Sequence, residues 1–198
     1  MGLNIVSKKG QTPIEDDDRE YLKIKGLSSL EELNFYEHEN ITKARRWLLK
    51  KKKFKAEEVL REKFILEIHK KMFADVWLFA GKLRDKDMNI GSSVRNIRTD
   101  LRNLIDDFKY WLDNKTFSQE EMIVRFKHRL VKIHPFRNGN GRHSRLMAEV
   151  LCEKVFSLAP FSWGNVENDD GAREKYLQAL RLADSGDYRE ILGLVREA

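Results

Sequence analysis

Cysteine and long apolar runs are both scarce in this sequence, and each scarcity excludes a class of protein. The single cysteine, Cys152, excludes an internal disulfide framework and a cysteine-based zinc site, which favours a reducing cytoplasm. No run approaches the roughly 18 apolar residues that a membrane span requires. The first residues also lack the apolar stretch of a secretion signal. We therefore expect a cytoplasmic protein that does not enter a membrane.

Charged residues, by contrast, are abundant. They make up 35% of the 198 residues, beside 41% hydrophobic residues, which predicts one compact soluble domain. The formal net charge is +6, and the excess of Lys and Arg is concentrated in one basic run: Arg45, Arg46, Lys50–Lys53 and Lys55. Such a run is most often a solvated helix face. Nucleic acid or an acidic protein is the alternative partner, and nucleic acid is not favoured because no aromatic residues alternate with the charges.

Helical patterns follow one another along most of the chain. Residues 1–26 are polar and acid-rich, and we expect them to form an arm on the surface. Ser29 and Ser118 each precede a glutamate by three residues, a capping box that predicts the start of a helix. Apolar residues recur at helical spacing over 57–79, whereas residues 82–96 lack this period and contain short runs that could pair as a hairpin. The sequence therefore predicts an all-α fold with one small β element.

One segment between two predicted helices combines residues suited to phosphate chemistry. It reads His134-Pro-Phe-Arg-Asn-Gly-Asn-Gly-Arg-His-Ser-Arg145. Gly139 and Gly141 let the backbone turn tightly and present its N–H groups to an anion at the start of the next helix. Arg142 and Arg145 lie three residues apart, so both can face that anion, and arginine suits phosphate oxygens. Because His134 can accept a proton from an attacking hydroxyl, the segment predicts phosphoryl or nucleotidyl transfer.

At every fixed position this segment resembles the motif of the Fic family, H-x-F-x-(D/E/N)-G-N-G-R-x-x-R. The resemblance implies a helical bundle with a small β-hairpin flap. It also implies an enzyme that moves AMP from ATP onto a Ser, Thr or Tyr hydroxyl of a target protein, with Mg²⁺ as cofactor. ATP and an unknown target protein are therefore the expected partners, and a second copy of the chain (a homo-oligomer) is a further candidate.

The resemblance assigns a role to each matching residue. His134 is the general base, and Phe136 anchors the loop in the core. The phosphate-binding groups follow in the motif: the backbone of Gly139, Asn140 and Gly141 forms an anion hole, and Arg142 and Arg145 hold the outer phosphates. Asn138 stands where many members have the Asp or Glu that binds magnesium. Because an amide brings an oxygen but no charge, this departure predicts weaker activity or altered metal selectivity.

Residues 83–97 match the position of the family's flap, and we call them the flap segment. In the family this flap pairs with the target as a strand and so aligns its hydroxyl with the α-phosphate. Asn89, Ile90 and Gly91 are expected at its tip or target-facing edge. Similarity to the small bacterial branch called mobile mystery protein B extends over nearly the whole chain, through Gln11-Thr-Pro13, Trp77-x-x-Ala-Gly-Lys-x-Arg84, Phe161-Ser-Trp-Gly164 and Tyr176-x-x-Ala-Leu.

Many Fic proteins also carry an inhibitory helix with the pattern (S/T)-x-x-x-E-(G/N), whose Glu pairs with the second motif arginine. This chain offers Phe35-Tyr-Glu-His-Glu39-Asn40, with Phe35 in place of Ser or Thr. Within a single Fic domain at 27–198, residues 27–55 are therefore a candidate inhibitory helix, with Glu39 expected to pair with Arg145. The alternative is that Glu39 is one of many surface glutamates on a charged helix.

Two other functions stay open from the sequence. The same site could carry different chemistry, namely removal of AMP or transfer of UMP, phosphate or phosphocholine. The chain could instead be a non-catalytic binding module, in which a degenerate site behind Asn138 is silent and the basic surface binds a partner. The position of the transferred label separates the first group of reactions, since AMP transfer alone moves the α-phosphate together with adenosine.

Overall fold

The computed structural model describes residues 16–27, 29–163, 166 and 169–196. In this part the chain forms eight α-helices: α1 (Leu30–Leu49), α2 (Ala56–Val59), α3 (Glu62–Phe73), α4 (Ile97–Asn114), α5 (Gln119–Ile133), α6 (Asn140–Val150), α7 (Asp170–Asp184) and α8 (Arg189–Leu194). Two 3-10 helices and a π-helical continuation of α6 are added to them: η1 (Asp16–Tyr21), η2 (Val94–Asn96) and η3 (Leu151–Phe156). The predicted all-α class is confirmed. No helix in these ranges is both long and apolar enough to cross a membrane.

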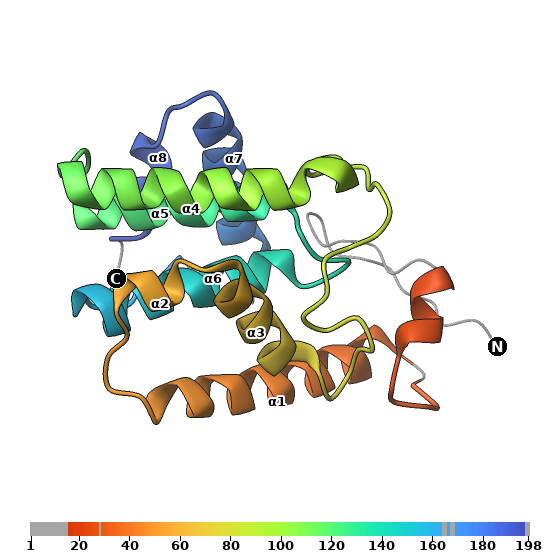
Figure 1. The fold of residues 1–198 in the computed structure, drawn as a ribbon. Coiled ribbons are helices and arrows are strands. Elements are labelled where there is room, and N and C mark those ends of the chain that lie inside the picture. Colours follow the sequence, from red (N-terminus) through yellow and green to blue (C-terminus); the bar gives the residue numbers. More distant parts are fainter. Residues whose placement is uncertain (1–15, 28, 164–165, 167–168, 197–198) are drawn as a thin grey trace.

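The helices pack in the spatial order α4, α5, α6, α3 and α1. Figure 1 shows α4 and α5 side by side along one side of the molecule and α1 along the opposite side, with α3 and α6 between them. Helices α7 and α8 pack on each other, and α8 also packs on α5. Helix α5 contacts α6 directly, and most residues of the segment that links them are buried.

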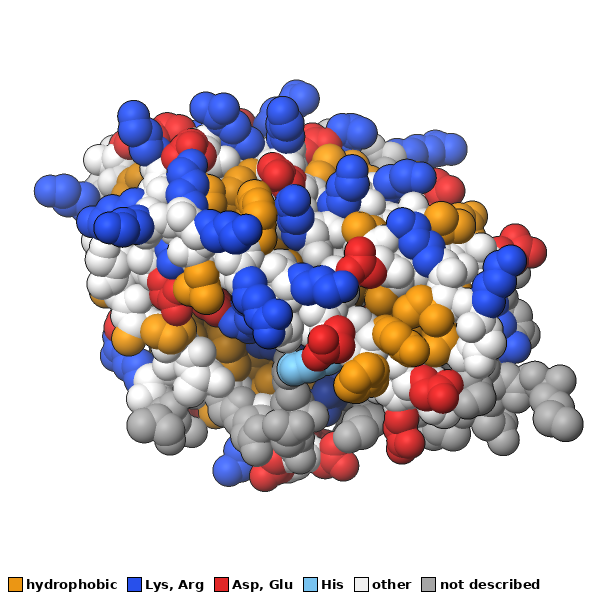
Figure 2. All heavy atoms as spheres, turned by 90° about the horizontal axis from the view of Figure 1, so that it is seen from below, with side chains coloured by type: hydrophobic (Ala, Val, Ile, Leu, Met, Phe, Trp, Pro, Cys, Tyr) orange, Lys and Arg blue, Asp and Glu red, His pale blue; other side chains and the backbone are white. Residues whose placement is uncertain are grey.

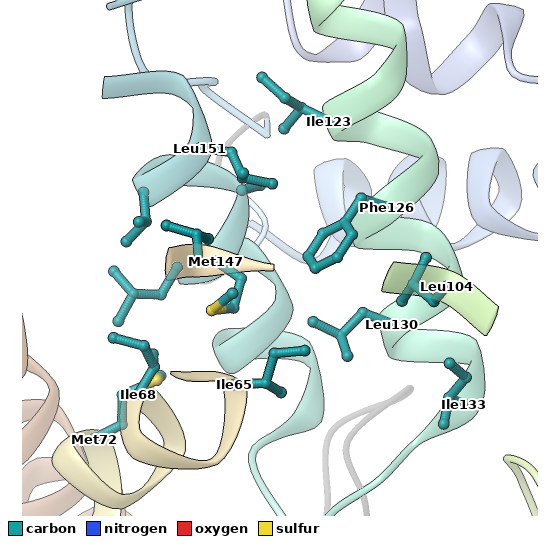
Figure 3. Close-up of a cluster of buried hydrophobic side chains, with 14 of the residues drawn as sticks. Ile65, Ile68, Met72, Leu104, Ile123, Phe126, Leu130, Ile133, Met147 and Leu151 are labelled. Atoms are coloured by element: carbon teal, nitrogen blue, oxygen red, sulfur yellow. The ribbon is translucent and has the colours of Figure 1, made fainter. Parts of the chain in front are cut away.

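The hydrophobic core lies where α3, α4, α5 and α6 face one another. Figure 3 shows side chains from these elements and from η3 pointing toward a common centre: Ile65, Ile68, Met72, Leu104, Ile123, Phe126, Leu130, Ile133, Met147 and Leu151. All of them are buried. Removing a side chain of this kind from water stabilises a fold by about 1.5–3 kcal/mol. The helices on either side of the α5–α6 link are therefore firmly fixed by packing.

Both predicted helix starts are confirmed by their capping bonds. The Ser29 hydroxyl accepts a hydrogen bond from the N–H of Glu32 at 3.2 Å, and α1 begins at the next residue. The Ser118 hydroxyl accepts from the N–H of Glu121 at 3.2 Å at the start of α5. Each bond satisfies a backbone donor that the first helical turn leaves without a partner.

The helix predicted over 57–79 is wrong in its limits. Leu60 leaves the helical region, with φ of −83° and ψ of 58°, and separates α2 from α3. Helix α3 then ends at Phe73, because the chain turns where the N–H of Asp75 donates to Oδ1 of Asn40 at 2.8 Å. Val76 and Phe79 keep the helical spacing and are buried, but they reach the core from this turn. The helical spacing of the apolar residues therefore predicted which of them are buried, but it did not predict the limits of the helix.

The β-hairpin expected in the flap segment is also wrong. Among the described residues, β pairing is limited to one isolated bridge, between Leu22 and Trp77. The flap segment bonds to the α5–α6 link and does not pair with itself: the N–H of Arg84 donates to the carbonyl of Pro135 at 2.9 Å, and the N–H of Ser92 donates to that of Ile133 at 3.1 Å. The segment is thus a loop held by its neighbour.

The basic run occupies the C-terminal half of α1 and the residues after it. Figure 2, which views the molecule from the α1 side, shows many Lys and Arg side chains spread over this face, with fewer acidic ones between them. Arg45 pairs with Glu149, and Lys51 pairs with Glu58 at 2.8 Å. Lys50, Lys52, Lys53 and Lys55 are exposed to solvent. Mixed charges and high exposure are typical of a solvated face, and binding of a partner there stays a prediction.

Candidate active site

The link between α5 and α6 is tight because two of its residues adopt left-handed backbone conformations. His134 has a φ of 54° at the end of α5, and Gly139 has a φ of 78° immediately before α6. A Cβ added at Gly139 would lie 2.4 Å from the ring of Phe73, so a larger residue cannot fit without displacing that ring. The link therefore brings the end of α5 next to the N-terminus of α6.

The side chain of Asn140 closes this link. Its Oδ1 accepts from the N–H of Phe136 at 2.9 Å, and its Nδ2 donates to the carbonyl of Phe136 at 2.7 Å. Asn140 is only 2% exposed. The sequence predicted a role for its backbone alone, so the clamp is a second role that the motif spacing did not reveal. Two bonds from one amide fix the conformation of the loop before the helix begins.

Phe136, the expected core anchor, is fully buried and stacks on a histidine of α3. The rings of Phe136 and His69 lie 3.7 Å apart between centroids and are nearly parallel. His69 accepts the N–H of Gly81 at Nδ1 (2.9 Å), so its Nε2 carries hydrogen and donates to the carbonyl of Asn138 at 3.0 Å. Burial lowers the pKa of His69 well below its ordinary value; the bond to Asn138 opposes this shift, and the positive charge of Arg142 adds to it. His69 is therefore neutral, and it supports the loop by stacking on Phe136 and by its bond to Asn138.

The expected base, His134, is 6% exposed and held by its own helix. Its Nδ1 lies 3.3 Å from the carbonyl of Val131, which places the hydrogen on Nδ1 and the lone pair on Nε2. Burial lowers its pKa to about 4, the bond to Val131 opposes that shift, and the positive charge of Arg84 adds to it. His134 is therefore neutral at pH 7 and able to accept a proton.

The two motif arginines extend from the first turns of α6 toward different elements. The guanidinium of Arg142 pairs with the carboxylate of Glu37 on α1 at 2.7 Å and lies 5.2 Å from the centroid of the Phe73 ring. Burial raises the pKa of the Tyr176 hydroxyl on α7, and the neighbouring positive charge of Arg145 opposes that shift. Both arginines are partly exposed. Cationic groups on two sides of a helix N-terminus form a site for a polyanion such as a triphosphate.

The acidic residue that pairs with Arg142 is Glu37, and this corrects the expectation for Glu39. Glu37 is 2% exposed, and it accepts from Nε1 of Trp77 at 2.7 Å as well as from Arg142. Glu39 is exposed. Two residues along an α-helix differ by about 200° in direction, so the two side chains point to opposite sides of α1. The contact also falls on the first motif arginine, whereas the sequence predicted Arg145.

The expected flap residues lie beside His134. Asn89, Ile90 and Gly91 are all exposed, Ile90 at 57%. A Cβ added at Gly91 would lie 2.6 Å from Cβ of His134, and the φ of Gly91 is 101°. The exposed edge of the flap segment therefore touches the side chain of His134 at Gly91.

The donor set does not build a resident magnesium site. Asn138 is half-buried, and its Oδ1 already accepts the N–H of Gly139 at 2.6 Å. Within the described ranges no group of three or more His, Cys, Asp or Glu residues converges on one point. Magnesium usually takes one or two carboxylates beside substrate phosphates. One neutral oxygen is a weaker donor than that, and we assign no chemical step to a bound ion.

Acid is expected to destabilise this fold, because three of its buried histidines are neutral. Burial lowers the pKa of His128, His134 and His143 to about 4 each. In the unfolded chain they titrate near 6.5, so unfolding takes up protons between pH 6.5 and 4, and stability is lost as the pH falls through this window. The loss is about 1.4 kcal/mol per pH unit for each histidine.

We expect the thermal midpoint, followed by circular dichroism, to fall by roughly 10–20 °C from pH 7 to pH 5. The exposed His38 provides the control, because replacing it with glutamine leaves the three buried rings in place. A midpoint that does not change between these pH values would contradict the neutral, buried state of the three histidines.

Comparison with known proteins connects this geometry to a family. The model of the Fic/DOC family matches residues 59–152, which include α3 to α6 and the link before α6. The protein adenylyltransferases Fic of Aedes aegypti and Drosophila virilis are each 30% identical over 139 residues, which cover 68% of this chain and 27% of the relative. The chain therefore spans little more than a quarter of the length of these relatives.

Solved structures share the fold over most of the chain. The N-terminal Fic domain of a putative cell filamentation protein from Bartonella quintana has a TM-score of 0.69 at 16% identity, with 90% of each chain covered. The BepC protein of Bartonella tribocorum, solved with bound AMPPNP, has a TM-score of 0.68 at 16% identity, with 95% of this chain and 92% of that chain covered. The similarity to mobile mystery protein B stays a prediction. The chain belongs to the Fic/DOC family, through the region that carries the loop between α5 and α6.

Proposed function

We propose that this protein is an adenylyltransferase, which moves AMP from ATP to a Ser, Thr or Tyr hydroxyl of a target protein. The observation that carries the proposal is a neutral, buried His134 placed between an exposed flap edge and a helix N-terminus flanked by Arg142 and Arg145. Curated relatives named protein adenylyltransferase Fic and a relative solved with AMPPNP support the choice of ATP. The single cysteine supports a cytoplasmic setting, and the resemblance to mobile mystery protein B supports a bacterial one.

The proposed reaction needs one base and one site for the leaving group. The target hydroxyl attacks the α-phosphorus of ATP, and its proton passes to Nε2 of His134. The new P–O bond forms while the bond to the bridging oxygen of the leaving pyrophosphate breaks. The N–H groups at the start of α6 and the guanidinium groups of Arg142 and Arg145 compensate the negative charge on the outer phosphates. Magnesium bound with ATP would compensate charge on the phosphates, and Asn138 would offer it one amide oxygen.

Within the same proposal, α1, which lies in the candidate inhibitory segment 27–55, inhibits the site through Glu37. Its carboxylate occupies Arg142, a group that the proposal assigns to the outer phosphates. The bond from Trp77 holds the carboxylate in place while it is buried. ATP can use Arg142 only after this ion pair breaks, so the pair competes with the nucleotide for one guanidinium.

The position of the label tests the proposed reaction. Purified protein is incubated with magnesium and a bacterial lysate, in one reaction with α-³²P ATP and in another with γ-³²P ATP. We expect labelled protein from the α-labelled nucleotide alone, because AMP keeps the α-phosphate and the γ-phosphate leaves in pyrophosphate. Label from the γ-position would identify phosphate transfer instead. Label from neither position would direct the search to UTP, to phosphocholine donors or to removal of AMP.

A further inference from the structure

Arg84 is a buried arginine whose guanidinium group is held mainly by backbone carbonyls. It is 3% exposed; its Nε donates to the carbonyl of His134 and its Nη1 to that of Lys86, both at 2.8 Å, and its Nη2 donates to that of Ser92. Among the described residues its one ion-pair partner is Asp87, 3.8 Å away with a side chain 70% exposed, which contributes little. A guanidinium buried without a close carboxylate is costly. Because this burial is costly, the bonds from the guanidinium to the three backbone carbonyls indicate that Arg84 has a function.

The backbone joins the same two segments that the guanidinium joins. The N–H of Arg84 donates to the carbonyl of Pro135, and the N–H of Ser92 donates to that of Ile133. The acceptors lie on either side of His134, and the two donors belong to the flap segment. The side chain and the backbone together thus tie the base of the flap to both neighbours of the catalytic histidine.

His134 requires this support because of its backbone conformation. A left-handed φ, here 54°, costs a residue other than glycine about 1 kcal/mol or more, so surrounding bonds must maintain it. Arg84 supplies a charge-assisted bond to the carbonyl of this residue. At Gly91, an added Cβ would lie 3.0 Å from Nη2 of Arg84 and 2.6 Å from Cβ of His134. Gly91 at the flap edge therefore lies against both the side chain of His134 and the guanidinium of Arg84.

We infer that Arg84 is a positioning residue, which fixes the flap segment and His134 to each other so that a target hydroxyl held by the flap meets the base in one geometry. The inference rests on the proposed function, since it assumes a hydroxyl delivered at the flap. The expected phosphate ligands Arg142 and Arg145 have their own partners on α1 and α7. Loss of Arg84 therefore impairs transfer and leaves ATP binding intact.

The test compares Arg84→Met and Arg84→Lys with Arg102→Met, in which an exposed arginine of α4 is replaced as a matched control. Calorimetry gives the affinity for ATP, transfer from α-³²P ATP to lysate protein gives activity, and NMR gives the pKa of the His134 ring. We expect Arg84→Met to reduce transfer on the order of 100-fold with ATP affinity unchanged. The His134 pKa should rise toward 6.5, because a nearby positive charge is lost and water reaches the ring.

Arg84→Lys keeps the charge and one donor group, so it is expected to lie between the control and Arg84→Met. Transfer by Arg84→Met at the level of Arg102→Met would overturn the inference, as would a loss of transfer no larger than the loss of ATP affinity. If Arg84→Met does not fold, Gly91→Ala decides, since it disturbs the same contact from the exposed side. Full transfer by Gly91→Ala would overturn the inference. If the Glu37→Gln protein, in which Arg142 is released, transfers no label, the proposed function fails. An unchanged His134 pKa in Arg84→Met would refute the positioning role separately.

Discussion

Replacing His134 with alanine is expected to reduce transfer of AMP by about 10²–10⁴-fold, the range that a positioned general base contributes. In the folded protein the ring is neutral at pH 7, its Nδ1 faces the carbonyl of Val131, and Nε2 carries the lone pair. Alanine removes this lone pair and leaves the hydroxyl proton of the target with no acceptor on the protein. The measurement is the initial rate of label transfer from α-³²P ATP to lysate protein.

Binding of ATP separates this result from a general loss of structure. The groups proposed to bind phosphate belong to α6, and the loop before them is held by the side chains of Asn140 and His69 rather than by the His134 ring. Calorimetry should therefore give the same ATP affinity for His134→Ala as for the unaltered protein. A variant that keeps its ATP affinity and also transfers label at the original rate would show that His134 is not the base.

The part of the site that could be predicted from the sequence is the part that lies within one short segment. His134, Asn138 and Arg145 fall within twelve consecutive residues, and a loop between two helices has little freedom to separate them. Burial of Phe136 follows from the same local pattern, since the chain must enter the bundle between α5 and α6. The closeness of these residues in the sequence therefore predicts that they lie close together in the structure, without reference to contacts from distant parts of the chain.

The residues that were missed act across long separations in the sequence. His69 contacts the loop from α3, and Tyr176 lies next to Arg145 from α7. Arg84 bonds to the carbonyl of His134 from the flap segment. A buried polar residue within an apolar helical stripe was the available signal for His69, which lies four residues after Ile65. The hairpin prediction failed for a related reason, because short extended runs say nothing about which carbonyls their N–H groups will meet.

The helical period could have separated Glu37 from Glu39. Buried positions of α1 follow one stripe, which consists of Leu33, Glu37, Asn40, Ala44 and Leu48. A glutamate on the buried stripe of an amphipathic helix needs a partner, whereas a glutamate outside it is solvated. The family pattern predicts Glu39 instead, and it matches this chain only in part because Phe35 replaces Ser or Thr.

Replacing Glu37 with glutamine is therefore expected to increase both ATP affinity and label transfer, by roughly 10-fold or more if the charged hydrogen bond contributes about 1.5–3 kcal/mol. Glutamine keeps an oxygen that can accept the Nε1–H of Trp77, so the packing of α1 on the site is preserved. It removes the negative charge that holds Arg142. The guanidinium is then available to the outer phosphates of ATP without first breaking an ion pair.

Glu39→Gln is the matched control, because it makes the same chemical change on the same helix, two residues away, at an exposed position. Calorimetric titration with ATP and the initial rate of transfer from α-³²P ATP are compared for the two variants and the unaltered protein. An increase confined to Glu37→Gln supports inhibition through Arg142. An increase confined to Glu39→Gln would show instead that α1 rotates in solution to bring Glu39 onto the motif. If neither variant gains affinity, the Glu37–Arg142 pair stabilises the packing of α1 and does not limit access of the nucleotide.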